Sequence, residues 1–131
     1  KTPTCLYMAL HYGIVPANYP LADEEFESGK LPAGLLSFRH KLYGLTISPS
    51  RLVQIRNERR PESRYASSGQ VGYELRSAQA LFRKFGIPCR DTTECSIAEI
   101  ASTVLARLGL LDRSGAETGP ESAPGPASGD A

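Results

Sequence analysis

The chain of 131 residues has few cysteines, no long apolar run and almost no net charge, and each shortage argues against a class of protein. Its three cysteines are widely spaced and form no C-x-x-C pair, which argues against a disulfide scaffold and a zinc site. No apolar run approaches the roughly 20 residues that cross a bilayer, so no membrane span is expected. The net charge is +1, and the basic stretch from Arg51 to Arg64 is too modest to predict nucleic-acid binding. We expect reduced thiols in a cytoplasmic protein.

The composition divides the chain into a globular part and a tail. Hydrophobic residues make up 40% and charged residues 22%, which is typical of a globular domain and excludes collagen-like, coiled-coil and wholly disordered chains. After Leu111 the character changes, because fourteen of the residues 112–131 are Gly, Ala, Pro or Ser and none is large and apolar. Such a segment buries too little surface to offset the entropy of ordering. We expect one domain over residues 1–111 and a disordered tail over residues 112–131.

Helix caps, stop signals and hydrophobic spacing predict four helices. The clearest covers Val71 to Phe85, where apolar residues recur at spacings of three and four. Thr2 before Pro3, and Ser48 before Pro49, are typical of an N-cap followed by the first helical residue. The remaining boundaries are a stop at Gly13, an end near Arg59, and a last helix from the capping box of Ser96 and Glu99 to Gly109.

Three short apolar runs are candidate strands: Ile14–Ala17, Lys41–Ile47 and Ile87–Asp91. The segments Asp23–Lys30 and Pro61–Gly69 are expected to be loops. Helices that alternate with strands across short loops predict an α/β fold, with a mostly parallel sheet flanked by helices. In such sheets ligands bind at the carboxyl ends of the strands. That rim would contain Asn18, Thr46 to Ser48 and Asp91 to Thr93, although Ser48 and residues 91–93 are also explained as cap and turn residues.

The first two residues resemble the end of a phosphate-binding loop. In a P-loop, backbone N–H groups cradle phosphates, a Lys neutralises phosphate oxygens, and the next hydroxyl reaches Mg²⁺ or phosphate. Lys1 and Thr2 are therefore candidate nucleotide-binding residues, and Thr2 is a candidate metal ligand. The same pair is also explained by a helix start beside a solvated lysine. Because the chain opens without Met, one residue before a helix, we expect a fragment whose N-terminal part, with the glycines of the loop, lies upstream.

Several separate blocks, in one order, resemble a bacterial family of regulatory enzymes. The blocks are KTPTCLY at 1–7, ANYP at 17–20, KLYGLTI at 41–47, RLVQIRNERR at 51–60, SRYAS at 63–67 and DTT at 91–93. Together they resemble the pyruvate, phosphate dikinase regulatory protein family, and more closely its phosphoenolpyruvate synthetase (pyruvate, water dikinase) branch. The resemblance runs from Lys1 to about Leu108 and leaves out the tail.

This resemblance implies a bifunctional serine/threonine kinase and phosphorylase. Members use ADP to phosphorylate and inactivate a threonine of the dikinase, and they reverse this with inorganic phosphate, releasing pyrophosphate. It therefore implies that residues 1–111 are a C-terminal nucleotide-binding domain with a P-loop-like sheet. The implied partner is phosphoenolpyruvate synthetase, with Mg²⁺ as a further candidate cofactor and homo-oligomer formation left open. The alternatives are the same activity on pyruvate, phosphate dikinase, a non-enzymatic interaction module, and a P-loop small-molecule kinase.

Within this reading, the anionic substrates call for cationic side chains. Guanidinium groups bind phosphate bidentately, which makes Arg56, Arg59, Arg60 and Arg64 candidate phosphate- and substrate-binding residues. A solvated helix face also explains Arg56 and Arg59, whereas Arg64 is expected in a loop, where functional residues concentrate. Asp91 is the candidate base for the target hydroxyl. Lys1 would contact the donor phosphates, and the two histidines are expected to be structural or surface residues.

Overall fold

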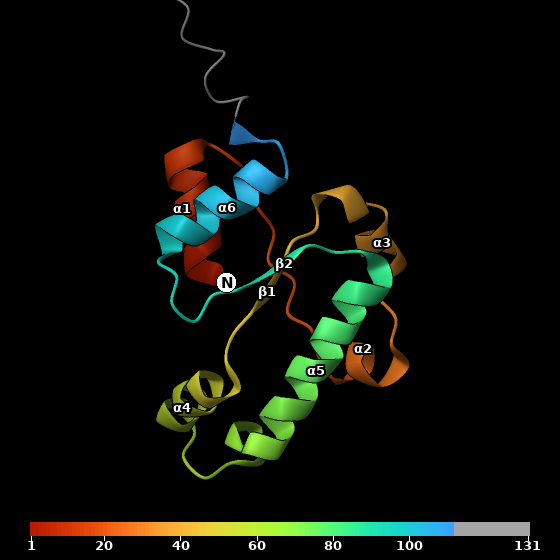
Figure 1. Cartoon of the computed structure of the whole chain (residues 1–131), viewed down its shortest axis with the longest axis vertical. Coiled ribbons are helices and arrows are strands. Elements are labelled where there is room, and N and C mark those ends of the chain that lie inside the picture. Colours follow the sequence, from red (N-terminus) through yellow and green to blue (C-terminus); the bar gives the residue numbers. More distant parts are fainter. Residues whose placement is uncertain (112–131) are drawn as a thin grey trace, which may run out of the picture.

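The computed structural model describes residues 1–111, so the predicted tail lies outside the described residues (Figure 1). The helices are α1 (Thr2–Tyr12), α2 (Asp23–Ser28), α3 (Ala33–Leu36), α4 (Pro49–Arg59), α5 (Ser68–Phe85) and α6 (Ile97–Arg107). The strands are β1 (Gly44–Thr46) and β2 (Cys89–Asp91), and two short 3₁₀ helices are η1 (Arg39–Lys41) and η2 (Arg64–Ala66). None of the helices in this part of the chain is long and apolar enough to cross a membrane.

The two strands form a parallel pair, as the sequence predicts, but both are shorter than expected. Gly44 lies opposite Cys89 and Thr46 opposite Asp91. The chain passes from β1 to β2 through α4, η2 and α5, which is the helical crossover that parallel strands require. The carboxyl ends of both strands therefore meet at the same edge of the sheet.

The third strand, predicted at Ile14–Ala17, is wrong, because the sheet within residues 1–111 has two strands. Pro16 has no backbone N–H to donate to a neighbouring strand. Val15 is 98% exposed, whereas Ile14 packs against the cluster between α1 and α6. Residues 14–17 are therefore an extended connection in which Ile14 packs against the core. The apolar composition of this segment does not by itself distinguish such a connection from a strand.

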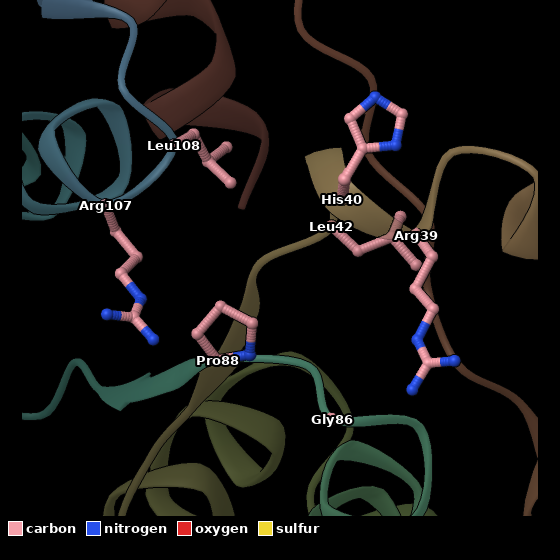
Figure 2. A pocket seen from close by; sticks show the side chains of 7 residues that line it. All are labelled: Arg39, His40, Leu42, Gly86, Pro88, Arg107 and Leu108. Atoms are coloured by element: carbon pink, nitrogen blue, oxygen red, sulfur yellow. The ribbon is translucent and has the colours of Figure 1, made fainter.

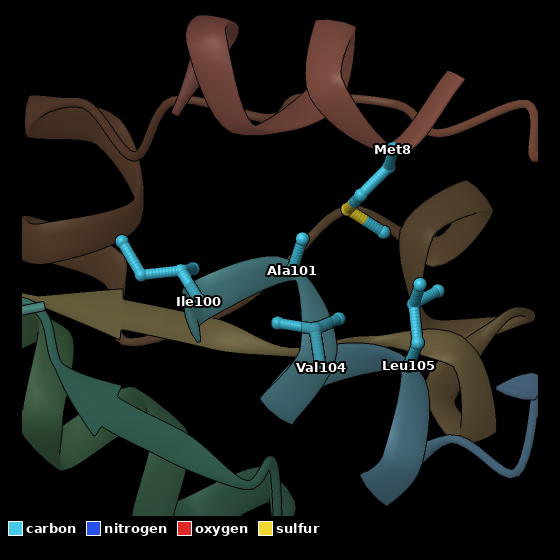
Figure 3. Close-up of a cluster of buried hydrophobic side chains, with 5 residues drawn as sticks. All are labelled: Met8, Ile100, Ala101, Val104 and Leu105. Atoms are coloured by element: carbon cyan, nitrogen blue, oxygen red, sulfur yellow. The ribbon is translucent and has the colours of Figure 1, made fainter. Parts of the chain in front are cut away.

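Two hydrophobic clusters lie on the two faces of β1. Between α1 and α6, Met8 reaches toward the buried face of α6, which the buried residues Ile100, Ala101, Val104 and Leu105 form (Figure 3). A second cluster around Leu31, Leu81 and Ile87 includes side chains of α2, α3 and α5. In β1, Leu45 packs against the first cluster, while Gly44 faces Phe82 of α5. The strand is thus covered on both faces, as in other parallel sheets.

Most predicted helix boundaries are confirmed, with one correction at the start. The Ser48 hydroxyl accepts a hydrogen bond from the Arg51 N–H at 3.3 Å, and the Ser96 hydroxyl accepts one from the Glu99 N–H at 3.1 Å. Thr2 is not an N-cap: α1 begins at Thr2, and Lys1 occupies the cap position without a capping side chain. Proline is tolerated throughout the first helical turn, so Pro3 does not define the first residue.

The region between Asp23 and Lys30 is not a loop throughout, because α2 occupies Asp23–Ser28. The Glu25 carboxylate accepts hydrogen bonds from the Tyr19 hydroxyl at 2.6 Å and from the Ala22 N–H at 2.9 Å, and so caps the helix. These bonds, the Tyr19 bond first, lower the pKa of Glu25. The predicted loop Pro61–Gly69 is likewise shortened, since Ser67 caps α5 at residue 68.

Candidate functional site

Polar residues from both strand ends are bonded to one another at the carboxyl edge of the sheet. The backbone N–H and the hydroxyl of Thr92 each donate to the Thr46 carbonyl oxygen at 2.9 Å. The Ser48 N–H donates to Thr93 Oγ1 at 2.8 Å. The structure therefore brings together the two segments that the sequence places at the rim, residues 46–48 and 91–93. We call them the rim.

Asp91, at the end of β2, presents an ionised carboxylate on this rim. Its Oδ1 accepts hydrogen bonds from the Thr93 hydroxyl and, at 2.8 Å, from the Thr93 N–H. These bonds, the hydroxyl bond first, lower the pKa of Asp91. Within residues 1–111 no hydrogen bond engages Oδ2, and Asp91 is exposed. The lowered pKa weakens the carboxylate as a base, while the two bonds fix its direction.

The start of α1 is the second group of predicted site residues. Lys1 is exposed and forms no ion pair within the described part of the chain. Since no side chain of residues 1–111 caps this helix, its N-terminus has backbone N–H groups available for an anion. Asn18, expected at the rim, instead donates from Nδ2 to the Thr2 hydroxyl at 3.5 Å. No hydrogen bond or ion pair within residues 1–111 joins this group to Asp91.

The four arginines divide into one enclosed and three exposed side chains. Arg56 is 14% exposed and forms an ion pair with Glu74 of α5, with 2.6 Å between Arg56 Nη2 and Glu74 Oε2. Its Nη1 donates to the Tyr65 carbonyl oxygen at 3.0 Å. Its guanidinium carbon lies 4.1 Å from the centroid of the Tyr65 ring, a cation–π contact. Arg56 thus joins α4 to both η2 and α5.

The other three arginines, Arg59, Arg60 and Arg64, are exposed and form no ion pair within the described residues. Arg59 and Arg60 lie at the end of α4, whose first residue, Pro49, adjoins the rim. A helix of 11 residues is about 16 Å long, so these guanidinium groups and the rim belong to opposite ends of α4. The predicted residues therefore form separate groups rather than a single pocket.

Two contributors to these groups, Tyr65 and Glu74, escape sequence reasoning, whereas Thr93 lies in a segment that is expected at the rim. Thr93 has a recognisable signal, because a hydroxyl two residues after Asp is typical of an Asx turn. Glu74 and Tyr65 have none, since their role depends on the packing of α5 and η2 against α4. No group of three or more His, Cys, Asp or Glu side chains suitable for a metal ion occurs between residues 1 and 111.

A hollow of about 510 Å³ lies at the other end of the sheet, beside Leu42 and Pro88, which precede the strands (Figure 2). Arg39 and Arg107 extend toward it from opposite sides, and His40 points away from Pro88. Arg39 Nε donates to the Phe85 carbonyl oxygen at 2.7 Å, so this arginine also caps the C-terminus of α5. Ligands of parallel sheets bind at the carboxyl ends, and this hollow is at the amino ends.

Sequence comparison identifies the family. The sequence model of the family described as kinase/pyrophosphorylase matches residues 1–105, and the chain belongs to that family. A relative in Stenotrophomonas maltophilia (strain R551-3), named "Putative phosphoenolpyruvate synthase regulatory protein", is 56% identical over 110 residues, which are 84% of this chain. Relatives of the same name in Laribacter hongkongensis and Pseudomonas aeruginosa (strain LESB58) are 55% and 52% identical over 113 residues, or 86% of this chain. The chain spans about 40% of the length of these relatives. No solved structure matches it.

Proposed function

We propose that this chain is part of a bifunctional regulator of phosphoenolpyruvate synthase. The main support is the match of residues 1–105 to the kinase/pyrophosphorylase family, together with the names of relatives that are 52–56% identical. In the kinase direction, the threonine oxygen of the synthase attacks the β-phosphorus of ADP, and AMP leaves. In the other direction, inorganic phosphate attacks the phosphothreonine, and pyrophosphate leaves with the threonine restored. The activity is proposed for the whole protein, acting in the cytoplasm.

The residues of α1 and the rim can serve the two ends of this transfer. Lys1 and the uncapped start of α1 supply positive charge for the phosphates of ADP. Asp91 orients the threonine hydroxyl through Oδ2 and accepts its proton. The Thr2 hydroxyl would be one ligand of Mg²⁺, which takes most of its other ligands from phosphate oxygens and water and would neutralise phosphate charge. Such transfer depends mainly on positioning and charge stabilisation.

The exposed arginines suit the protein substrate. Arg59, Arg60 and Arg64 present guanidinium groups without ion pairs in residues 1–111 at one end of α4, where they suit an acidic segment of the synthase. A substrate that contacts both these arginines and Asp91 must extend along α4, which a protein can do and a small molecule cannot. This geometry favours a protein kinase over a small-molecule kinase.

The test is phosphoryl transfer by the protein in its natural full-length form. Purified phosphoenolpyruvate synthase and radiolabelled ADP are expected to give labelled synthase, and phosphate is then expected to release pyrophosphate. Lys1→Ala should lower kcat/KM by about 10²-fold or more, as loss of a group that stabilises transition-state charge does. Lys30→Ala, a change of the same charge at an exposed loop position, is the matched control.

The outcomes separate the alternatives. Transfer to pyruvate, phosphate dikinase but not to the synthase would change the assigned target. Binding to the synthase without any transfer would favour the interaction module. Full activity of Lys1→Ala in both directions would remove the role of this lysine while leaving the family assignment intact.

A further inference from the structure

One side chain, Arg56, holds the connection between α4 and α5 in a defined shape. One terminal nitrogen of its guanidinium bonds the Tyr65 carbonyl oxygen, and the other pairs with Glu74. The ring of Tyr65 lies against the guanidinium plane at 4.1 Å. Because the Arg56 and Glu74 side chains are only 14% and 16% exposed, water screens this pair weakly. The connection is therefore anchored to both helices through a single group.

Further contacts extend this anchor to the backbone of Arg64. Gln70 Nε2 donates to Glu74 Oε1 at 3.0 Å, which orients the carboxylate that Arg56 contacts. The Ser67 hydroxyl donates to the Arg64 carbonyl oxygen at 2.7 Å. The Arg64 side chain itself is exposed and forms no ion pair within residues 1–111. A fixed backbone thus presents a free guanidinium.

We propose that Arg56 is a positioning residue, which holds the η2 segment so that Arg64 binds an acidic side chain of the synthase away from the reacting threonine. The assignment rests on the proposed function. Both terminal nitrogens of Arg56 are engaged, and its Nε is buried without a partner among the described residues, so neither edge of this guanidinium is open to bidentate binding of a carboxylate or phosphate. Arg64 has such an edge. Arg56 therefore acts through Tyr65 and Glu74, and Arg64 makes the contact.

Glu74→Gln distinguishes this role from direct phosphate binding by Arg56. Loss of the ion pair should loosen η2, so that KM for the phosphorylated synthase rises about tenfold or more in the phosphorylase reaction, with kcat less affected. Arg56→Lys keeps the charge but cannot contact the Tyr65 carbonyl oxygen and Glu74 at the same time, so it should raise KM as Glu74→Gln does. If Arg56 bound phosphate directly, Glu74→Gln would free its guanidinium, and an unchanged or lower KM would overturn the proposal.

Amide hydrogen exchange of residues 62–67 provides a readout that does not need turnover. Glu74→Gln and Arg56→Lys should accelerate exchange there, whereas Arg64→Gln should raise KM and leave exchange unchanged. Arg76→Gln, at an exposed position of α5, is the control and should change neither. Unchanged exchange in both Glu74→Gln and Arg56→Lys would overturn the proposal, whether or not the wild-type protein turns over substrate. Absence of turnover by the wild-type protein would instead refute the proposed function.

Discussion

The approach of β1 to α5 can be tested by adding a single carbon atom at Gly44. A Cβ at this position would lie 2.7 Å from Cε2 and Cζ of Phe82 and 2.9 Å from its Cδ2. Carbon atoms in ordinary contact are about 3.5–4.0 Å apart, so the ring or the strand must shift by about 1 Å. Overpacking of this kind costs about 1–3 kcal/mol. For a domain of 60–100 residues, each kcal/mol lowers Tm by about 4–8 °C.

Thermal and urea unfolding of Gly44→Ala would measure this cost. Gly69→Ala is the matched control, because nothing lies within 4 Å of its added Cβ and it sits in the first turn of α5, where alanine should stabilise by up to about 1 kcal/mol. Replacing the ring by the smaller side chain in Phe82→Leu should recover part of the stability lost in Gly44→Ala, so the effects of the two changes should be non-additive. A Gly44→Ala protein as stable as the wild type, or strictly additive changes, would refute the packing of β1 on Phe82 and with it the position of the rim.

Two further predictions concern the rim and the core. Asp91 has a lowered pKa in the folded state, so its ionisation stabilises the fold above its unfolded pKa, and this contribution is lost as the pH falls through the folded pKa. Thr93→Val removes the hydroxyl donor; the pKa of Asp91 should rise and the contribution should shrink, as an NMR titration of the carboxyl would show, and an unchanged titration would contradict the hydrogen bond. Leu105→Ala should lower the free energy of unfolding by about 2–5 kcal/mol, because this side chain is fully buried between α6 and α1. Leu10→Ala, at a side chain that is 74% exposed, should change it by about 0.5 kcal/mol or less, and equal effects of the two changes in urea unfolding would contradict the assigned core.

The meeting of the two strand ends was predictable from the sequence, whereas the difference between the four arginines was not. The rule that ligands bind at the carboxyl ends of parallel strands places residues 46–48 and 91–93 together, and the structure confirms that they touch. The roles of Lys1, Thr2 and Asp91 stay predictions. The group of arginines at the end of α4 is visible in the sequence, but the sequence does not show which of the four side chains is enclosed and which are exposed. Only the approach of Glu74 and Tyr65 encloses Arg56 and leaves Arg64 free.

Local chemistry determined what the sequence could reveal alone. Serine caps, left-handed glycines such as Gly13, and three- and four-residue hydrophobic spacing act within one or two turns of chain, and they predicted the end of α1 and the helices α4, α5 and α6. The alternation of helices with short apolar runs predicted the parallel pair of strands. Tertiary structure decided the rest. It decided that Ile14–Ala17 pairs with no strand within residues 1–111, and that the hydroxyl of Thr93 accepts a hydrogen bond from the N–H of Ser48, 45 residues away. These outcomes depend on contacts between distant segments, whose free energy no local pattern of residues encodes.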